Sequence, residues 1–235
     1  MQPEVVFDPY SEYAFAFESL RKRKIAAISI GRTYADIWLA KYPGEFRVAF
    51  DYADDCCAFL LPKGSPLKAR LDAEIARMRA SGECARIYEK WCAAARCGAN
   101  VRLPEFPTQP AGAPEVKVAC AATSEPWCFV SSEGIVGIDV EILLTAAQRL
   151  GWRLSLKSFS WGGMVDAVNG RRTDIACGGI YTNGLEFPTV DASERYVDER
   201  MCVLVLDASG NRGQSFLASL KGASCAHSSR RAAGG

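Results

Sequence analysis

Apolar residues recur along the second half of the chain with two different spacings. Residues 138–150 have an apolar residue at about every fourth position, which predicts a helix that ends at Gly151. Asp139 and Glu141 suit the positive N-terminal end of this helix, and a shorter helix is predicted over residues 160–170. Runs typical of covered strands occupy residues 116–122, 153–157, 173–180 and 200–206. Strands that alternate with helices predict an α/β fold with mainly parallel sheets covered by helices.

The first half of the chain repeats this alternation. A helix is expected to begin at Ser65 and Pro66, a favourable N-cap followed by a favourable first residue, and to end at Gly82. Further helices are predicted over residues 11–24, 32–43 and 83–92, and strands over residues 25–30, 46–52 and 56–62. Both halves are therefore expected to form α/β structure of the same kind.

A proline-rich stretch separates the two halves. Residues 98–115 contain four prolines and two glycines with little apolar periodicity, which is typical of an extended linker. We therefore expect one folded segment over residues 1–97 and a second over residues 116–210. Residues 211–235, where the apolar pattern is lost, are expected to be a disordered or disrupted tail.

Charge and composition exclude several classes of partner. The 235 residues include 28 basic and 27 acidic side chains, and a net charge of +1 does not favour nucleic acid as a partner. No apolar run approaches the roughly 20 residues that a membrane-spanning helix needs. The first residues, MQPEVVFDPYSEY, lack the charged and apolar regions of a signal peptide, so no export signal is expected within this chain.

The ten cysteines and the one histidine do not follow a metal-binding pattern. No two cysteines have the C-x-x-C spacing of zinc sites, and His227 lies in the low-complexity tail. We therefore expect no metal and no cofactor, with most cysteines buried as small apolar residues. The sequence leaves open a disulfide between Cys84 and Cys92, or between Cys92 and Cys97. Because neither folded segment contains a histidine or a recognisable pair of carboxylates, we expect no enzymatic activity.

The order of short motifs in the second half resembles that of one protein family. The first strand is followed by Pro126-Trp127-x-Phe129, then by G-I-V-G-I-D-V-E at 134–141, WGGMVDAVNGRRTDIACGGIYT at 161–182 and VDASERY at 190–196. This order resembles the first lobe of the bacterial extracellular solute-binding proteins of family 3. The resemblance implies the periplasmic-binding-protein class II fold, in which members commonly bind amino acids.

The first half resembles the opposite end of the same fold. The segments that carry this resemblance are residues 17–31 and 58–91. The order is then the tail of one module, a linker and the head of the next, which implies a fragment of a tandem of two modules. The sequence leaves open whether the two halves instead pack into one module with their order exchanged.

The resemblance implies a set of solute contacts. In this fold the solute lies between two lobes that close by hinge motion, near the carboxyl ends of strands. Aromatic rings and backbone N–H groups are expected to bind it, and the predicted ligand-binding residues are Trp127, Phe129, Trp161, Gly178, Gly179 and Thr182. The aromatic residues also suit an apolar core, and the glycines also suit a purely structural turn.

Two charged contacts of the family have no counterpart in this chain. Leu185 stands where the family has an arginine for the carboxylate of the solute, and Gly31 stands where it has an aspartate for the ammonium group. Leucine cannot make the bidentate contact of a guanidinium. The sequence therefore leaves open a solute other than a zwitterionic amino acid, or a degenerate module that binds none.

The function implied by the resemblance is solute capture for transport. We expect a small polar solute and the membrane permease of an ABC importer as partners, no nucleic acid, and a periplasmic or cell-surface location. The same fold also serves as the ligand-sensing ectodomain of membrane receptors, which is the alternative function.

Overall fold

The computed structural model describes residues 13–182 and 188–207. They fall into two compact units: the larger contains residues 54–182 and 188–199, and the smaller contains residues 13–53 and 200–207. Leu185 and the predicted tail, residues 211–235, lie outside the described residues. Within the described ranges, no helix combines the length and the apolar character needed to span a lipid bilayer.

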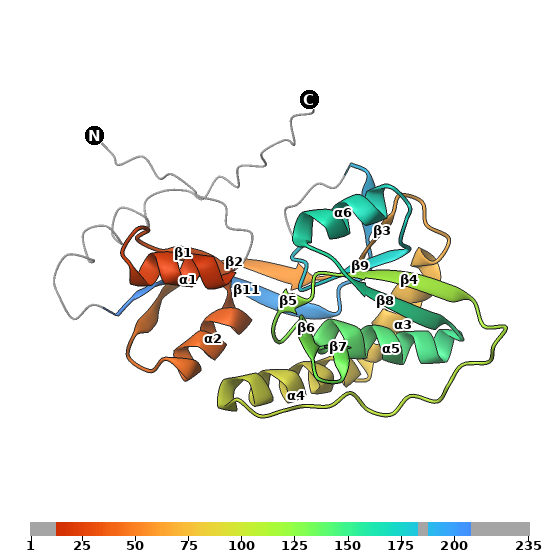
Figure 1. Cartoon of the computed structure of the whole chain (residues 1–235), viewed down its shortest axis with the longest axis horizontal. Coiled ribbons are helices and arrows are strands. Elements are labelled where there is room, and N and C mark those ends of the chain that lie inside the picture. The colour runs from red at the N-terminus through yellow and green to blue at the C-terminus, as the bar shows by residue number, and fades with distance from the viewer. Residues whose placement is uncertain (1–12, 183–187, 208–235) are drawn as a thin grey trace. The chain divides into compact units, whose positions relative to one another are not determined.

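The larger unit is built on a five-stranded sheet with the order β10-β3-β9-β4-β8 (Figure 1). Strand β4 pairs in parallel with β8 and β9, whereas β3 pairs antiparallel with β9 and β10. The strands are β3 (Leu60–Pro62), β4 (Glu115–Cys120), β8 (Arg153–Ser158), β9 (Ile175–Cys177) and β10 (Val190–Ala192). The predicted α/β fold is confirmed. The sheet is mixed because helical crossovers make β4, β8 and β9 parallel, while β3 comes from the first half and runs the opposite way.

Helices cover both faces of this sheet. Helix α6 packs on one face and α5 on the other, with α3 and α4 packed against α5 (Figure 1). Their bounds are α3 (Lys68–Ala80), α4 (Glu83–Cys97), α5 (Ile138–Leu150) and α6 (Trp161–Asn169). Ala119 and Ala176 belong to the apolar core beneath α6. Because successive side chains of a strand point to opposite faces, their neighbours Cys120 and Cys177 point toward α5.

Helix α5 begins and ends where the sequence predicts, with a glycine at each end. Gly151 ends the helix with φ 69°, and Gly137 precedes it with φ 130° and ψ −176°. The loop before the helix caps it, because the carbonyls of Pro126 and Trp127 accept the N–H groups of Ile138 and Asp139 at 2.9 and 3.0 Å. A Cβ atom at Gly137 would lie 2.3 Å from the carbonyl oxygen of Trp127, so only glycine fits there.

The first half of the chain contributes to the same unit as the second half. Strand β3 lies inside the sheet, and the indole Nε1 of Trp91 in α4 donates to the Glu141 carboxylate in α5 at 2.7 Å. Lys90 pairs with the same carboxylate. Segments on both sides of the linker therefore pack into one folded unit, which was left open by the sequence. That the two halves derive from consecutive modules stays a prediction.

The boundary between the units does not coincide with the proline-rich linker. It falls between residues 53 and 54, within the long strand β2 (Phe46–Cys57), and again between residues 199 and 200. The sequence predicted two shorter strands over residues 46–52 and 56–62, and the structure joins the first of them to residues 53–57 as one strand.

Helix α3 begins later than predicted. Its first residue is Lys68 and its N-cap is Leu67, rather than the predicted Pro66 and Ser65. The hydroxyl of Ser65 accepts the N–H of Leu67 at 3.4 Å, so it closes a turn before the helix instead of capping it. Helix α4 runs to Cys97, five residues beyond its predicted end.

A small three-stranded sheet between β4 and α5 was not predicted. Its order is β5-β6-β7, and its strands are β5 (Thr123–Ser124), β6 (Cys128–Ser131) and β7 (Gly134–Val136). Strands of two to four residues leave too few positions for an alternating pattern to be recognised in a sequence.

The smaller unit contains a three-stranded sheet with the order β1-β11-β2. Its other elements are α1 (Tyr13–Arg21), β1 (Ile28–Gly31), α2 (Arg32–Lys41) and β11 (Val197–Leu206), close to the predicted helices and strands. Phe17 of α1 stacks on Trp38 of α2 with ring centroids 3.6 Å apart, and Arg21 pairs with Glu45 at 2.6 Å. Gly31 ends β1 opposite Met201.

Candidate functional site

The carboxyl ends of β4, β8 and β9 lie at one edge of the sheet. Cys120 is the register partner of both Ser158 and Cys177. The chain continues side by side from these ends: the N–H of Ala121 donates to the carbonyl of Cys177, and the N–H of Phe159 donates to that of Cys120, both at 2.9 Å. The segments that hold the predicted site residues therefore start next to one another.

Among the predicted aromatic contacts, Trp161 offers the largest accessible surface. It is 45% exposed and is the first residue of α6. The side-chain oxygen of Ser160 accepts the N–H of Gly163, as an N-cap does, which confirms the predicted start of this helix. Phe129 is half-buried and packs edge-on against Trp91 of α4, with ring centroids 5.9 Å apart.

Trp127 is fully buried beneath the turn that follows β9. Its ring lies between Tyr88 and Tyr181, at centroid distances of 6.0 and 6.4 Å. A Cβ atom at Gly179 would lie 2.7 Å from Cγ of Trp127, so the turn rests directly on the indole. Among the described residues, the indole Nε1 has no hydrogen-bond acceptor. Trp127 therefore supports the turn from below and presents no accessible face.

The predicted backbone donors are bound to acceptors of the protein itself. The N–H groups of Gly178 and Gly179 both donate to one carboxylate oxygen of Asp139 at 2.8 Å. The N–H of Thr182 donates to the carbonyl of Cys56 at 3.0 Å. The contact of these three residues with a solute stays a prediction. The arrangement accounts for the glycines, which let the chain turn tightly around the carboxylate.

Asp139 organises this edge of the unit, a role that its place in the sequence did not indicate. Its side chain is fully buried, and its second oxygen accepts the hydroxyl of Tyr196 at 2.8 Å. A carboxylate in the first turn of a helix is usually explained by the helix dipole alone. The signal available in the sequence was the motif at 134–141, whose aspartate the resemblance alone did not explain.

The charge state of Asp139 is expected to make stability depend on pH. Burial raises the pKa of Asp139 from 3.8 to about 6, although hydrogen bonds from Gly179, Tyr196 and Gly178 oppose the shift. Because the folded state holds the proton more tightly than the unfolded chain, this stabilisation is complete below about pH 4 and is lost as the pH rises through about 6. We expect the stability of the wild type relative to Asp139→Asn to be about 2 kcal/mol greater at pH 4.5 than at pH 7.

Urea unfolding of both proteins at the two pH values measures this difference. A difference between wild type and Asp139→Asn that stays constant with pH would contradict the raised pKa.

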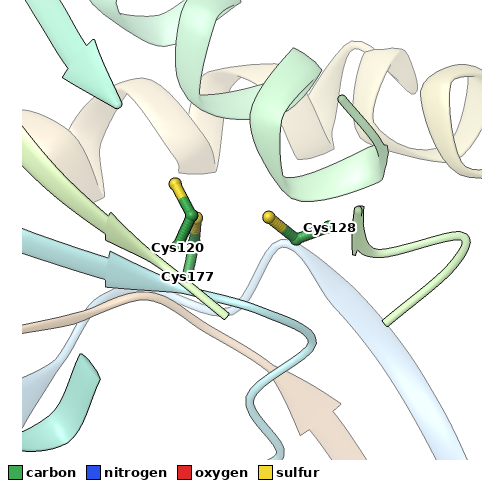
Figure 2. Close-up of side chains that lie close together, drawn as sticks. All are labelled: Cys120, Cys128 and Cys177. Atoms are coloured by element: carbon green, nitrogen blue, oxygen red, sulfur yellow. The ribbon is translucent and has the colours of Figure 1, made fainter. Parts of the chain in front are cut away.

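Three cysteines that sequence spacing did not connect meet beside Asp139. The sulfurs of Cys120, Cys128 and Cys177 lie within 4.8 Å of one another and all three residues are buried (Figure 2). The thiol of Cys177 lies 3.6 Å from the sulfur of Cys120 on the neighbouring strand. Hydrogen bonds from Cys128 and Cys177 lower the pKa of Cys120 to about 5. The pairing of β4 with β9 and the unpredicted strand β6 bring these residues together, so their spacing in the sequence gave no signal.

Comparison with known proteins links the second half of the chain to one family. Residues 116–222 match the family described as bacterial extracellular solute-binding proteins, family 3. The L-cystine-binding protein TcyA of Bacillus subtilis (strain 168) is 27% identical over 89 residues, which are 37% of this chain and 33% of that protein. The matched segment thus spans about a third of the length of this relative.

Two solved structures align with the chain at low similarity. A mutant of ArgBP from T. maritima aligns with 88% of this chain and 66% of its own, at 11% identity and a TM-score of 0.42. The arginine-bound form of domain 1 from TmArgBP aligns with 46% of this chain and 92% of its own, at 24% identity and a TM-score of 0.30. At these TM-scores the alignments do not locate site residues.

Proposed function

We propose that the chain binds a small polar solute outside the cytoplasm for an ABC-type importer, because residues 116–222 match family 3 of the bacterial extracellular solute-binding proteins. The partners would then be the solute and a membrane permease. Amino acids are the first class of solute to test, because the curated relative is named for binding L-cystine. Capture of a solute requires no catalytic group, which agrees with the absence of a recognisable catalytic motif from the sequence.

The proposed contact surface is the carboxyl edge of β4, β8 and β9, and the exposed ring of Trp161 at that edge is the observation that carries the proposal. Trp161 is 45% exposed, so a solute can pack against it. The positive end of α6, which Trp161 begins, favours a carboxylate or another anionic group nearby. An aromatic face beside a helix N-terminus suits a small solute that has an apolar part and an acidic part.

Binding of a zwitterion would need charged partners at positions other than those the family pattern implies. Gly31 contributes no side chain, and Leu185, which lies outside the described residues, cannot bind a carboxylate. This sequence therefore favours a solute that is bound by hydrogen bonds and by the aromatic face of Trp161. A module that has lost binding is its alternative.

Replacement of the exposed tryptophan tests the proposed surface. We expect at least one solute among amino acids, short peptides and organic acids to raise the melting temperature of the wild type and to change its tryptophan fluorescence. Trp161→Ala should bind that solute about 10-fold more weakly, because an aromatic contact is worth about 1–1.5 kcal/mol. Isothermal titration calorimetry of the two proteins measures the ratio of affinities.

Phe15→Ala is the matched control. Phe15 is an exposed aromatic residue of α1, so its removal should leave the affinity unchanged. Cystine can exchange with the exposed thiol of Cys97, so mass spectrometry should confirm that binding is not covalent. If no solute shifts the melting temperature, the degenerate module is supported; if Trp161→Ala binds like the wild type, the contact surface is wrong.

The sensing ectodomain is the second candidate function. The two functions predict different neighbours in the genome: a permease gene beside the solute-binding gene for import, or a membrane-spanning segment and a kinase-like region for sensing. Sequencing the region around the gene distinguishes them, independently of the binding experiment.

A further inference from the structure

The cluster of Cys120, Cys128 and Cys177 has the composition of a metal site. We propose that these three thiols bind a single soft cation, Cu(I), in trigonal coordination. Each thiol that becomes a ligand gives its proton to solvent, and no electron is transferred.

The distances between the sulfurs fit one shared cation. A metal bound to thiolates at about 2.3 Å places three trigonal sulfurs about 4 Å from one another. The sulfurs of Cys120 and Cys177 are 3.6 Å apart, and all three sulfurs lie within 4.8 Å of one another. Small rotations of the side chains therefore suffice to bring the three sulfurs to a common cation.

The three ligands come from segments that are already held in place. Cys120 and Cys177 are register partners at the ends of β4 and β9, and Cys128 begins β6 and reaches toward them from a separate segment (Figure 2). All three side chains are fully buried, and so is Trp127, which precedes Cys128. A site built on paired strands in a dry environment binds a cation with little loss of conformational freedom.

The number and type of ligands favour Cu(I) over zinc. Thiolates are soft ligands that select Cu(I), zinc or iron–sulfur clusters. Zinc takes four ligands in tetrahedral sites, and among the described residues the group contains three. The carboxylate of Asp139 already accepts three hydrogen bonds, from Gly178, Gly179 and Tyr196, so it is not a ready fourth ligand. Its charge interacts with Cys120 and Cys128 and favours a cation beside it.

A cation at this position would stabilise the segments around the proposed solute surface. Cys177 precedes the turn of Gly178 and Gly179, and Cys128 follows Trp127, on which that turn rests. A cation that binds only the folded state raises the melting temperature, by an amount that grows with the logarithm of its concentration relative to Kd. The proposal does not depend on solute binding, and it can fail or succeed independently of it.

Anaerobic titration of the reduced, full-length chain with Cu(I) tests the proposal. A chromogenic Cu(I) chelator is added as a competitor. It removes Cu(I) that is bound weakly to single cysteines, so the titration measures only the tight site. We expect one equivalent to bind with an increase in melting temperature. Cys120→Ala, Cys128→Ala and Cys177→Ala should each weaken this binding at least about 100-fold, since loss of a ligand costs at least as much as loss of an outer partner.

Cys92→Ala is the matched control, because Cys92 is a buried free cysteine of α4 and should be dispensable for the metal. Circular dichroism verifies that each variant is folded, and serine replacements, which keep the size of the side chain, serve if an alanine variant does not fold. The proposal is overturned if the wild type binds no tight equivalent, or if the cluster variants bind like Cys92→Ala. It is also overturned if zinc binds more tightly than Cu(I), or if a Cys120–Cys177 disulfide forms in air and the reduced protein still binds no Cu(I).

Discussion

Replacing Asp139 with alanine is expected to lower the free energy of unfolding by about 3–5 kcal/mol at pH 7. The carboxylate accepts hydrogen bonds from Gly178, Gly179 and Tyr196, each at 2.8 Å, in a fully buried position. Alanine leaves three buried donors without this acceptor, and an unsatisfied buried donor costs about 1–3 kcal/mol. Urea unfolding followed by circular dichroism measures the loss.

Asp198→Ala is the matched control for this variant. Asp198 is an exposed aspartate that pairs with Arg79 and Arg195 at 3.0 and 3.3 Å. Exposed ion pairs contribute about 0–1 kcal/mol, so the stability of this variant should remain close to that of the wild type. If Asp139→Ala loses no more stability than Asp198→Ala, Asp139 does not hold the turn after β9.

Gly137→Ala is expected to destabilise the larger unit by about 4 kcal/mol or more, enough to reduce the yield of folded protein. The new Cβ would lie 2.3 Å from the carbonyl oxygen and 2.7 Å from the carbonyl carbon of Trp127, and 2.8 Å from the carbonyl oxygen of Pro126. All three are backbone atoms that cannot rotate away, and the same two carbonyls cap α5. The yield of soluble protein and its melting temperature measure the effect.

Gly134→Ala separates this collision from the strain of a positive φ angle. Gly134 has φ 108°, close to the 130° of Gly137, but no atom lies within 4 Å of the position of its Cβ. Strain alone should cost about 1–3 kcal/mol. Equal losses for the two variants would show that the close approach of the Trp127 carbonyl is not what requires glycine at position 137.

The motif at 134–141 joins three parts of the larger unit. Gly137 lets the loop of Pro126 and Trp127 approach and cap α5, Asp139 holds the turn after β9, and Glu141 receives the indole N–H of Trp91 from α4. Three residues at the N-terminal end of one helix, all within about its first turn, thus fix a loop, a turn and a helix. This accounts for the concentration of two glycines and two carboxylates in eight residues.

Much of the regular structure could be predicted from apolar spacing. Helix α5 has the predicted bounds because an apolar stripe, acidic first-turn residues and Gly151 all indicate the same segment. The start of α3 was predicted two residues too early, because a serine that closes a turn has the same sequence signal as a serine that caps a helix. The small sheet of β5, β6 and β7 was missed because its strands are too short to show a period.

The candidate site was predictable only in part. Trp161 and the Gly178–Thr182 turn lie at the expected sheet edge, because parallel strands place their carboxyl ends together. The sequence left open whether Trp127 is a core residue, and it did not indicate that Asp139 accepts the Gly178 and Gly179 amides. A sequence shows which residue types lie near a strand end, but it does not show which hydrogen-bond donor pairs with which acceptor.

The sequence by itself determined the α/β class, the resemblance of the second half to a known family and the positions of most helices, because these depend on local periodicity and on short motifs. The tertiary structure decided that β3, α3 and α4 from the first half complete the unit of the second half. It also decided that Asp139 is a buried acceptor and that Cys120, Cys128 and Cys177 share one site. These relations depend on strand register and packing between residues far apart in the chain, which no local pattern encodes.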